Sequence, residues 1–244
     1  MTPVAAARLA DSSLARLDDY ARSALGCPPE TAHAGGVTLL ADPARARVVW
    51  HGYTLPIVGL SFATGAVFSV RPDVVEQLRR EMGSDVTLPA LDAAAVRRAL
   101  RAVKRTLPSA FTLAGDLRAA DAATFQPSPT AQRAELIPRD DPLGVHVRSR
   151  FDGEVFGVRG PQGRIVSWAA LKLKTPSVWE LAVATEADYR GHGYGRDVVS
   201  AATRFALDSG TIPIYVHDHD NSTSAFVSRA LGYQVYAEMI LGEY

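Results

Sequence analysis

The second half of the chain contains apolar runs of two kinds, and together they predict alternating strands and helices. Residues 154–160 and 164–174 are rich in β-branched and aromatic residues and flank the turn sequence GPQG, which predicts a β-hairpin. In residues 196–210 the apolar positions recur at helical spacing and end before Gly210, which predicts a helix. The same reasoning predicts strands at 178–185, 212–218 and 234–241 and a capped helix at 221–232.

The first half of the chain predicts several short strands followed by two helices. Apolar runs bounded by glycine, proline and aspartate predict strands at 37–40, 46–53, 57–62 and 66–70. Pro72 precedes an apolar stripe and predicts the start of a helix that ends at Gly83. A second stripe at helical spacing predicts a helix over residues 91–105.

A change of composition separates these two halves. The stretch Thr124–Gln132 holds two prolines among Ser, Thr and Gln residues, which is typical of a loop or linker. We therefore place a domain boundary just upstream, between residues 108 and 120. The expected organisation is an N-terminal α+β domain over residues 1–110 and a second α/β domain over residues 111–244.

Composition and charge exclude several classes of protein. The 244 residues are 47% hydrophobic, and the 26 basic residues balance 26 acidic ones, so the chain can bury a core but offers no basic stripe for nucleic acid or anionic membrane. The single cysteine, Cys27, rules out an intrachain disulfide and fits a reducing compartment. The N-terminal apolar run is too short for a secretory signal, so we expect a cytoplasmic protein.

Three glycines at alternate positions, Gly191, Gly193 and Gly195, lie between the strand predicted at 178–185 and the helix that follows. The first amides of a helix have no partner within the helix and attract phosphate oxygens, and glycine lets those oxygens approach the main chain. Arg190 adds a guanidinium suited to phosphate. The spacing fits neither the dinucleotide fingerprint nor the P-loop. The loop therefore predicts a site for the pyrophosphate of another nucleotide cofactor.

The run from Arg190 to Gly195 has the form R-x-x-G-x-G, and here the sequence resembles the GNAT superfamily of acyl-CoA-dependent N-acyltransferases. The context supports the resemblance: LAVATEADYRGHGYG, a helix, IPIYVHD and NSTSAFVSRALGY follow in the family's order. It covers roughly residues 112–244 and implies a mixed, mostly antiparallel sheet with flanking helices. The strands and helices of the N-terminal part are compatible with a degenerate copy of the same fold.

The resemblance also implies which residues bind acetyl-CoA. It places Leu181 and Val183 beside the pantetheine, with the amide of Val183 facing the thioester oxygen. It implies that Asn221 caps its helix and contacts the same arm. Pro213 suggests where one strand separates from its neighbour, because proline cannot donate to a ladder. The pyrophosphate would be held by the amides of Arg190, Gly191, His192, Gly193, Tyr194 and Gly195.

The residues that would move protons are harder to assign. Glu180 lies within an apolar strand, where burial would raise its pKa, so it is our candidate for the general base; the alternative is a carboxylate paired with an arginine. At the position where the family often has a tyrosine that protonates the leaving thiolate, this chain has Ser228. A serine hydroxyl is a poorer acid than a phenol, so Ser228 is either a weak donor to the sulfur or simply a polar helix residue.

The sequence HDHD at residues 217–220 raises the possibility of a metal site, since alternate residues share one face of a strand. The alternatives are a loop that faces cofactor or substrate and a solvated turn, and we expect no metal. The predicted function is transfer of acetyl from acetyl-CoA to a primary amine, on a small molecule or peptide, by direct attack. The alternative is a CoA-binding sensor or scaffold without turnover. Monomer and homodimer both stay open.

Overall fold

A computed structural model describes residues 8–28, 31, 36–50, 53–82, 101–108 and 110–243. The chain divides into two compact units that interleave along the sequence. Unit 1 comprises Met1–Leu17, Arg118–Val216 and Asn221–Gln234. Unit 2 comprises Asp18–Leu117, His217–Asp220 and Val235–Tyr244.

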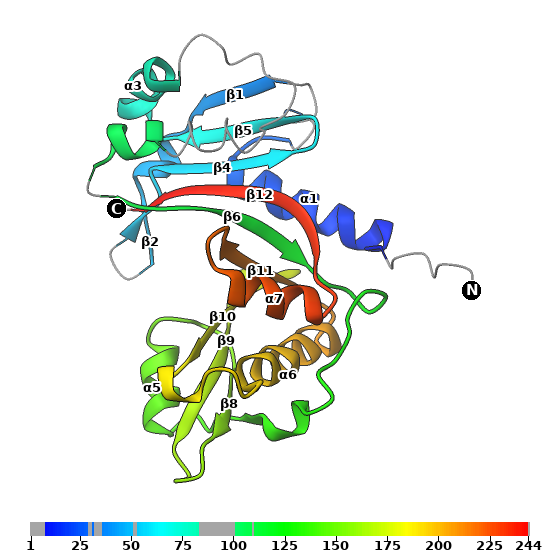
Figure 1. The fold of residues 1–244 in the computed structure, drawn as a ribbon. Helices are drawn as coiled ribbons and strands as arrows, with labels where there is room; N and C mark the ends of the chain where they lie inside the picture. The colour runs from blue at the N-terminus through cyan, green and yellow to red at the C-terminus, as the bar shows by residue number, and fades with distance from the viewer. Residues whose placement is uncertain are drawn as a thin grey trace. The chain divides into compact units, whose positions relative to one another are not determined.

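The strands of unit 1 form a mixed sheet in the order β11-β10-β9-β8-β7 (Figure 1). β10 and β11 are parallel, whereas the β10–β9, β9–β8 and β8–β7 pairs are antiparallel. The hairpin predicted from the GPQG turn is confirmed, because β8 and β9 pair across it. The strands are β7 (Glu135–Leu136), β8 (Val155–Arg159), β9 (Ile165–Thr175), β10 (Val178–Thr185) and β11 (Ile212–Asp218).

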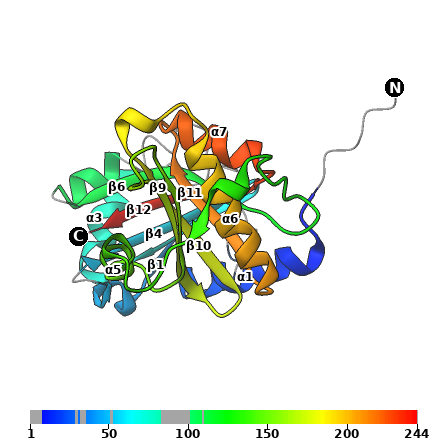
Figure 2. The same cartoon turned by 90° about the horizontal axis from the view of Figure 1, so that it is seen from below.

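Helix α6 (Tyr194–Asp208) packs against β8, β9 and β10. Figure 2 shows it running beside β10. Its apolar face joins a buried cluster that includes Leu181, Val198, Tyr215 and Tyr233. Helix α7 (Ser222–Ala230) follows β11, and a smaller cluster around Trp168 includes residues of α5 (Pro142–Arg148). Short 3-10 helices are η2 (Ala131–Arg133) and η3 (Ala187–Tyr189).

In unit 2 the strand order is β1-β5-β4-β12-β6, with β1 and β5 parallel and β4 antiparallel to both β5 and β12. Val74, Val75 and Leu78 of α3 (Pro72–Met82) are buried in the core of this unit, which confirms the predicted stripe. β2 (Val48–Trp50) and β3 (Tyr53–Thr54) form a separate pair, and η1 spans Pro43–Ala46. The other elements are β1 (Gly36–Ala41), β4 (Ile57–Phe62), β5 (Gly65–Val70), β6 (Phe111–Ala119) and β12 (Gln234–Glu243).

Most of the predicted elements are confirmed, but two helices were not predicted: α1 (Asp11–Leu25) and α5. Residues 101–106 are helical, and the rest of the helix predicted over 91–105 lies outside the described residues. The expected boundary region, residues 108–120, contains the regular strand β6 over most of its length. This strand was not predicted from the composition of the region. The domain boundary itself stays a prediction.

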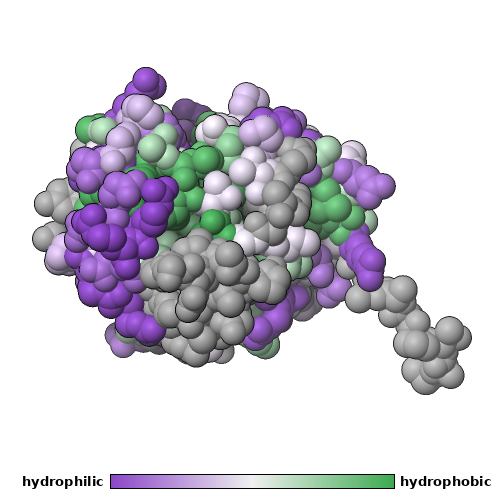
Figure 3. All heavy atoms as spheres, turned by 90° about the horizontal axis from the view of Figure 1, so that it is seen from above, coloured by the Kyte–Doolittle hydropathy of each residue, from purple (hydrophilic) through white to green (hydrophobic). Residues whose placement is uncertain are grey.

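Hydrophobic side chains are not confined to the core. Figure 3 shows one face of the molecule, on which hydrophobic residues, in green, lie beside hydrophilic ones, in purple. The exposed large hydrophobic residues include Val48, Val49, Phe111 and Phe226. Across the part of the chain that the structure describes, none of the helices combines the length and the apolar character needed to cross a membrane.

Candidate functional site

Strands β10 and β11 are paired over only part of their length. The parallel register runs from Val178 opposite Ile212 to Leu181 opposite Tyr215, yet β10 continues to Thr185. Pro213 lies within the paired segment, opposite Trp179, so the expected separation at Pro213 is wrong. The carbonyl oxygen of Pro213 accepts a hydrogen bond from the amide of Ala120 at 3.2 Å. The pairing ends two residues later, after Tyr215.

The glycine loop follows directly from the end of β10. Gly191 and Gly193 have φ angles of 80° and 81°, a left-handed conformation that residues with a Cβ adopt only with strain. The loop is closed on itself by His192, whose Nδ1 lies 2.9 Å from the carbonyl oxygen of Arg190. Its conformation therefore depends on glycine at two of the three positions that the sequence singled out.

The N-terminus of α6 differs from those of the neighbouring helices. Asp141 caps α5 and Asn221 caps α7, each through a side-chain oxygen that accepts from a main-chain amide. Gly193, which has no side chain, occupies the N-cap of α6. The first amides of α6 therefore lie at a main-chain surface where the positive end of the helix dipole favours an anion.

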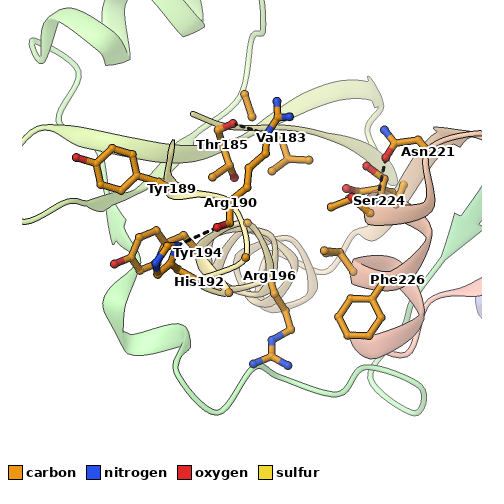
Figure 4. Close-up of a pocket in the computed structure, with 17 residues that line it drawn as sticks. Val183, Thr185, Tyr189, Arg190, His192, Tyr194, Arg196, Asn221, Ser224 and Phe226 are labelled. Atoms are coloured by element: carbon orange, nitrogen blue, oxygen red, sulfur yellow. Dashed lines mark hydrogen bonds between the residues drawn. The ribbon is translucent and has the colours of Figure 1, made fainter. Parts of the chain in front are cut away.

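A cavity of about 750 Å³ lies beside this loop, and all of its lining residues belong to unit 1. Figure 4 looks along α6, with Arg190 and Thr185 on one side of the helix. On the other side lie Asn221, the N-cap of α7, and Ser224 and Phe226 of α7. The predicted cofactor residues Val183, Asn221 and the whole loop from Arg190 to Gly195 line it. The other lining residues are Ala184, Thr185, Tyr189, Arg196, Tyr215, Thr223, Ser224, Phe226 and Val227.

Three predicted site residues lie away from this cavity. The side chain of Leu181 is 3% exposed and packs in the core, so it could reach a cofactor only through its main chain. Ser228 is fully buried, and its hydroxyl donates to the carbonyl of Ala225 at 3.1 Å. The position that the resemblance reserved for a general acid thus holds a serine whose hydroxyl is bound to its own helix.

Glu180 is also outside the cavity lining, and its expected electrostatics are wrong. One carboxylate oxygen lies 2.6 Å from Nζ of Lys172, and the other lies 3.0 Å from Nζ of Lys174. Burial by itself would raise the pKa of Glu180, but the charges and hydrogen bonds of the two lysines outweigh it and lower the pKa to about 2. The partners are lysines rather than the arginine considered as the alternative. A carboxylate with this pKa is a weak base at neutral pH.

Sequence reasoning missed a buried acid at the first turn of α6. Asp197 is fully buried and accepts hydrogen bonds from Ser128 Oγ at 2.6 Å and Thr130 Oγ1 at 2.7 Å. It also lies 3.0 Å from Nε of Arg133. The Arg133 guanidinium lies over the ring of Tyr194, 5.4 Å from its centroid, and a Cβ at Gly193 would be 3.8 Å from its Nη2. Through Ser128 and Thr130, the segment expected to be a linker is therefore hydrogen-bonded to the first turn of α6.

Among the described residues, no group of three or more His, Cys, Asp or Glu side chains is placed to hold a metal ion. Within unit 2, Nε2 of His219 lies 3.4 Å from Asp116 Oδ1 and 3.1 Å from Glu238 Oε1. His217 is buried, and its Nε2 is 4.0 Å from Asp116 Oδ2. These contacts bring two histidines and two carboxylates together in one cluster.

Comparison with protein families decides which kind of fold surrounds the cavity. Residues 117–233, which include every residue of the cavity lining, match the model of the acetyltransferase (GNAT) family. This part of the chain belongs to the GNAT family. GNAT family members use acetyl-CoA. None of the curated proteins compared with the chain matches it.

Solved structures of GNAT proteins are similar at low sequence identity. A GNAT-family protein from Novosphingobium aromaticivorans is 17% identical over 55% of this chain and 64% of that chain, just under two thirds of its length, with a TM-score of 0.47. A GCN5-related N-acetyltransferase from Kribbella flavida is 17% identical over 96% of each chain, with a TM-score of 0.49. A Salmonella typhimurium structure with its cofactor acetyl-CoA is 15% identical over 44% of this chain and 73% of that one, with a TM-score of 0.35.

Proposed function

We propose that the protein is an acetyl-CoA-dependent N-acetyltransferase that transfers the acetyl group directly to a primary amine of a small molecule or peptide. The observation that carries this proposal is the cavity beside the glycine loop. It lies within the segment that belongs to the GNAT family, and the predicted phosphate-binding residues line it together. Its volume of about 750 Å³ falls in the range of small-molecule and cofactor sites.

The residues around the cavity fit the phosphates of CoA. The glycine at the N-cap of α6 leaves main-chain amides accessible, and nothing lies within 4 Å of where a Cβ on Gly191 would be. Arg190 and Arg196 line the same cavity. Arg133, held by the buried Asp197, places its Nη2 3.8 Å from where a Cβ on Gly193 would be. We propose that these three arginines and the loop amides together hold the negatively charged part of the molecule.

Acetyl-CoA supplies an activated thioester carbonyl to the acceptor amine. In our proposal the main-chain N–H of Val183, beyond the point where β10 and β11 stop pairing, stabilises the negative charge that develops on the carbonyl oxygen. Asn221 caps α7 by accepting from the amide of Ser224 at 3.0 Å, and this fixes one wall of the cavity. With Glu180 held by two lysines, we propose that the amine reacts in its neutral form, having lost its proton to solvent.

A CoA-binding module without turnover is the second candidate, and two observations favour it. The carboxylate expected to act as base is held in ion pairs, and the serine expected to contact the sulfur is bound within its helix. Both candidates predict CoA binding, and only the enzyme predicts loss of the thioester.

Three further statements stay predictions. They are that the N-terminal part is a degenerate copy of the GNAT fold, that the protein is cytoplasmic, and that the amine is a small molecule or peptide. The chemistry of the acceptor is left to experiment, since the cavity described here is the one we assign to the donor.

The test measures binding and turnover with the same preparation. Calorimetry with CoA should give saturable one-site binding, and acetyl-CoA with a panel of primary amines should release CoA, measured by chromatography, faster than without amine. Absence of CoA binding would refute both candidates. Binding of CoA without amine-dependent release across the panel would favour the non-catalytic module.

A further inference from the structure

A buried tyrosine lines the cavity and belongs to neither the glycine loop nor the Asn221 cap of α7. Tyr215 lies on β11, is 2% exposed and lines the cavity. It is also the last residue of β11 in the parallel register with β10. Tyr215 therefore lies where the two strands stop pairing, and it lines the same cavity as Val183.

The hydroxyl of Tyr215 is held by a neighbouring helix. It forms a hydrogen bond with the side chain of Ser224 on α7, and Ser224 is itself fixed through its amide by Asn221. Both serine and asparagine line the cavity. The phenol is thus oriented by a residue that belongs to the site.

A second buried tyrosine shows what a purely structural role looks like here. Tyr233 packs edge-on against Tyr215, with ring centroids 5.8 Å apart. Its hydroxyl lies 2.6 Å from Thr203 Oγ1 on α6, and Tyr233 is not among the described residues that line the cavity. The two tyrosines have similar burial and packing, but only Tyr215 contributes to the cavity wall.

We propose that Tyr215 is the proton donor to the sulfur that leaves when the amide forms, in place of the buried Ser228. This inference rests on the proposed acetyltransferase function. When the C–S bond breaks, its electron pair stays on sulfur, and the phenolic proton of Tyr215 is transferred to it. The proton that the amine releases to solvent restores the phenol, so the overall reaction is balanced.

The surroundings of Tyr215 keep its hydroxyl in the protonated form. Burial raises the pKa of Tyr215, and the hydrogen bond with Ser224 offsets part of this effect. At neutral pH the side chain is therefore a neutral phenol that can donate a hydrogen bond to a developing thiolate. Ser228, by contrast, is not among the described residues that line the cavity, and its hydroxyl donates to the carbonyl of Ala225.

The first test compares Tyr215→Phe with Tyr233→Phe, since each variant keeps its ring and loses one buried hydroxyl. For acetyl transfer to the best amine of the panel, Tyr215→Phe should lower kcat by roughly 10²-fold, the usual size of a general-acid contribution, with little change in KM for acetyl-CoA. Tyr233→Phe should change kcat by less than about twofold if it stays folded. Ser224→Ala, which removes the partner of the phenol, should give a smaller loss of kcat than Tyr215→Phe.

The second test does not depend on turnover. Calorimetry compares CoA with desulfo-CoA, which lacks the thiol. The parent protein and Tyr233→Phe should bind CoA more tightly than desulfo-CoA, by about fivefold for one hydrogen bond. Tyr215→Phe should bind the two ligands equally, because the hydroxyl that contacts the sulfur is missing.

The outcomes separate this inference from the proposed function. If the parent transfers acetyl groups and Tyr215→Phe matches it in kcat and in preference for CoA, Tyr215 is not the donor although the enzyme is confirmed. If the parent binds CoA without turnover, the catalytic role of Tyr215 is refuted. If the parent does not bind CoA, the proposed function fails, and the assignment of Tyr215 fails with it.

Discussion

The surroundings of strand β10 differ between Glu180 and Val183. Glu180 is 13% exposed, and both of its oxygens are bound by lysines. Val183, three residues later, lines a cavity whose charged lining residues, within the described chain, are the arginines Arg190 and Arg196. The charge of Glu180 is balanced internally, whereas the cavity beside Val183 presents arginines and the main-chain amides of the glycine loop to whatever enters it.

This difference shows why a charged residue on a strand is a poor guide to chemistry unless its partners are known. From the sequence, Glu180 was the candidate general base because it stood alone among apolar neighbours. In the structure the lysines come from β9, where Lys172 is the antiparallel partner of Glu180. The groups left available for a ligand are instead main-chain amides, which a side-chain inventory does not include.

The largest effect should come from removing the carboxylate of Glu180, whose charge is balanced by two lysines. Glu180→Gln leaves two lysines close together without their carboxylate, and we expect a loss of roughly 3 kcal/mol in the free energy of unfolding. The matched control is Glu186→Gln, because Glu186 pairs with Arg164 but both side chains are about half exposed, and it should cost under about 1 kcal/mol. Urea unfolding of both variants measures the difference, and equal losses would contradict the importance of burial.

The same carboxylate gives a pH dependence of stability. The pKa of Glu180 is lowered to about 2, so its ionised form contributes stability that is present above the unfolded pKa near 4.3 and is lost as the pH falls toward 2. Glu180→Gln should remove this part of the acid sensitivity. If kcat/KM falls below pH 7, that titration should persist in the variant, because Glu180 stays ionised throughout this range.

A smaller effect, measured as CoA affinity, is expected at the glycine loop that lines the cavity. Gly193→Val places a β-branched residue at φ 81° beside the phosphate-binding amides, and CoA affinity should fall at least tenfold, about 1.4 kcal/mol. Gly163→Val is the control, since Gly163 has φ 78° in the β8–β9 turn, away from the cavity lining. Both variants should be destabilised, but calorimetry should show reduced CoA affinity only for Gly193→Val. A folded Gly193→Val with parental affinity would refute the phosphate site.

The smallest effect is expected at Arg133, which pairs with the buried Asp197 and lies beside the glycine loop. Arg133→Met keeps a long side chain over Tyr194 but removes the cation that Asp197 positions, and CoA affinity should fall about three- to fivefold, under 1 kcal/mol. Arg139→Met, which removes an exposed arginine paired with Glu154, should leave CoA affinity unchanged. Equal CoA affinity for Arg133→Met and the parent would show that Arg133 does not contact the phosphates.

Much of the fold could be predicted because strands and helices in unit 1 follow local patterns. The β8–β9 hairpin, the helix after the glycine loop and the Asn221 cap each depend on neighbouring residues, and each is confirmed. Helix α1 was not predicted, although its polar and apolar residues recur at helical spacing. Its N-terminal end is fixed by Asp121, which accepts from the amide of Ala10 and the hydroxyl of Ser13, more than 100 residues away.

The site was predictable only where it is built from consecutive residues. The loop from Arg190 to Gly195 lines the cavity as expected, because six adjacent residues share one turn. The environment of Glu180 depends on the register between β10 and β9, and that of Tyr215 depends on where the pairing of β10 and β11 ends. Neither register can be derived from the alternation of apolar and polar residues alone. This alternation shows which residues share a face of the sheet, but not which residues of two neighbouring strands lie opposite each other.

The arginines at the cavity also bear on how quickly a ligand can arrive. The chain as a whole carries no net charge, with 26 basic and 26 acidic residues, so it has no long-range attraction for an anion. Around the cavity, by contrast, the described lining residues that carry charge are Arg190 and Arg196. Such a local positive potential accelerates encounter with a polyanion, and salt screens it over about 8–10 Å near physiological ionic strength. Association of CoA with this neutral protein should therefore be fast at low salt and slow down as ionic strength rises.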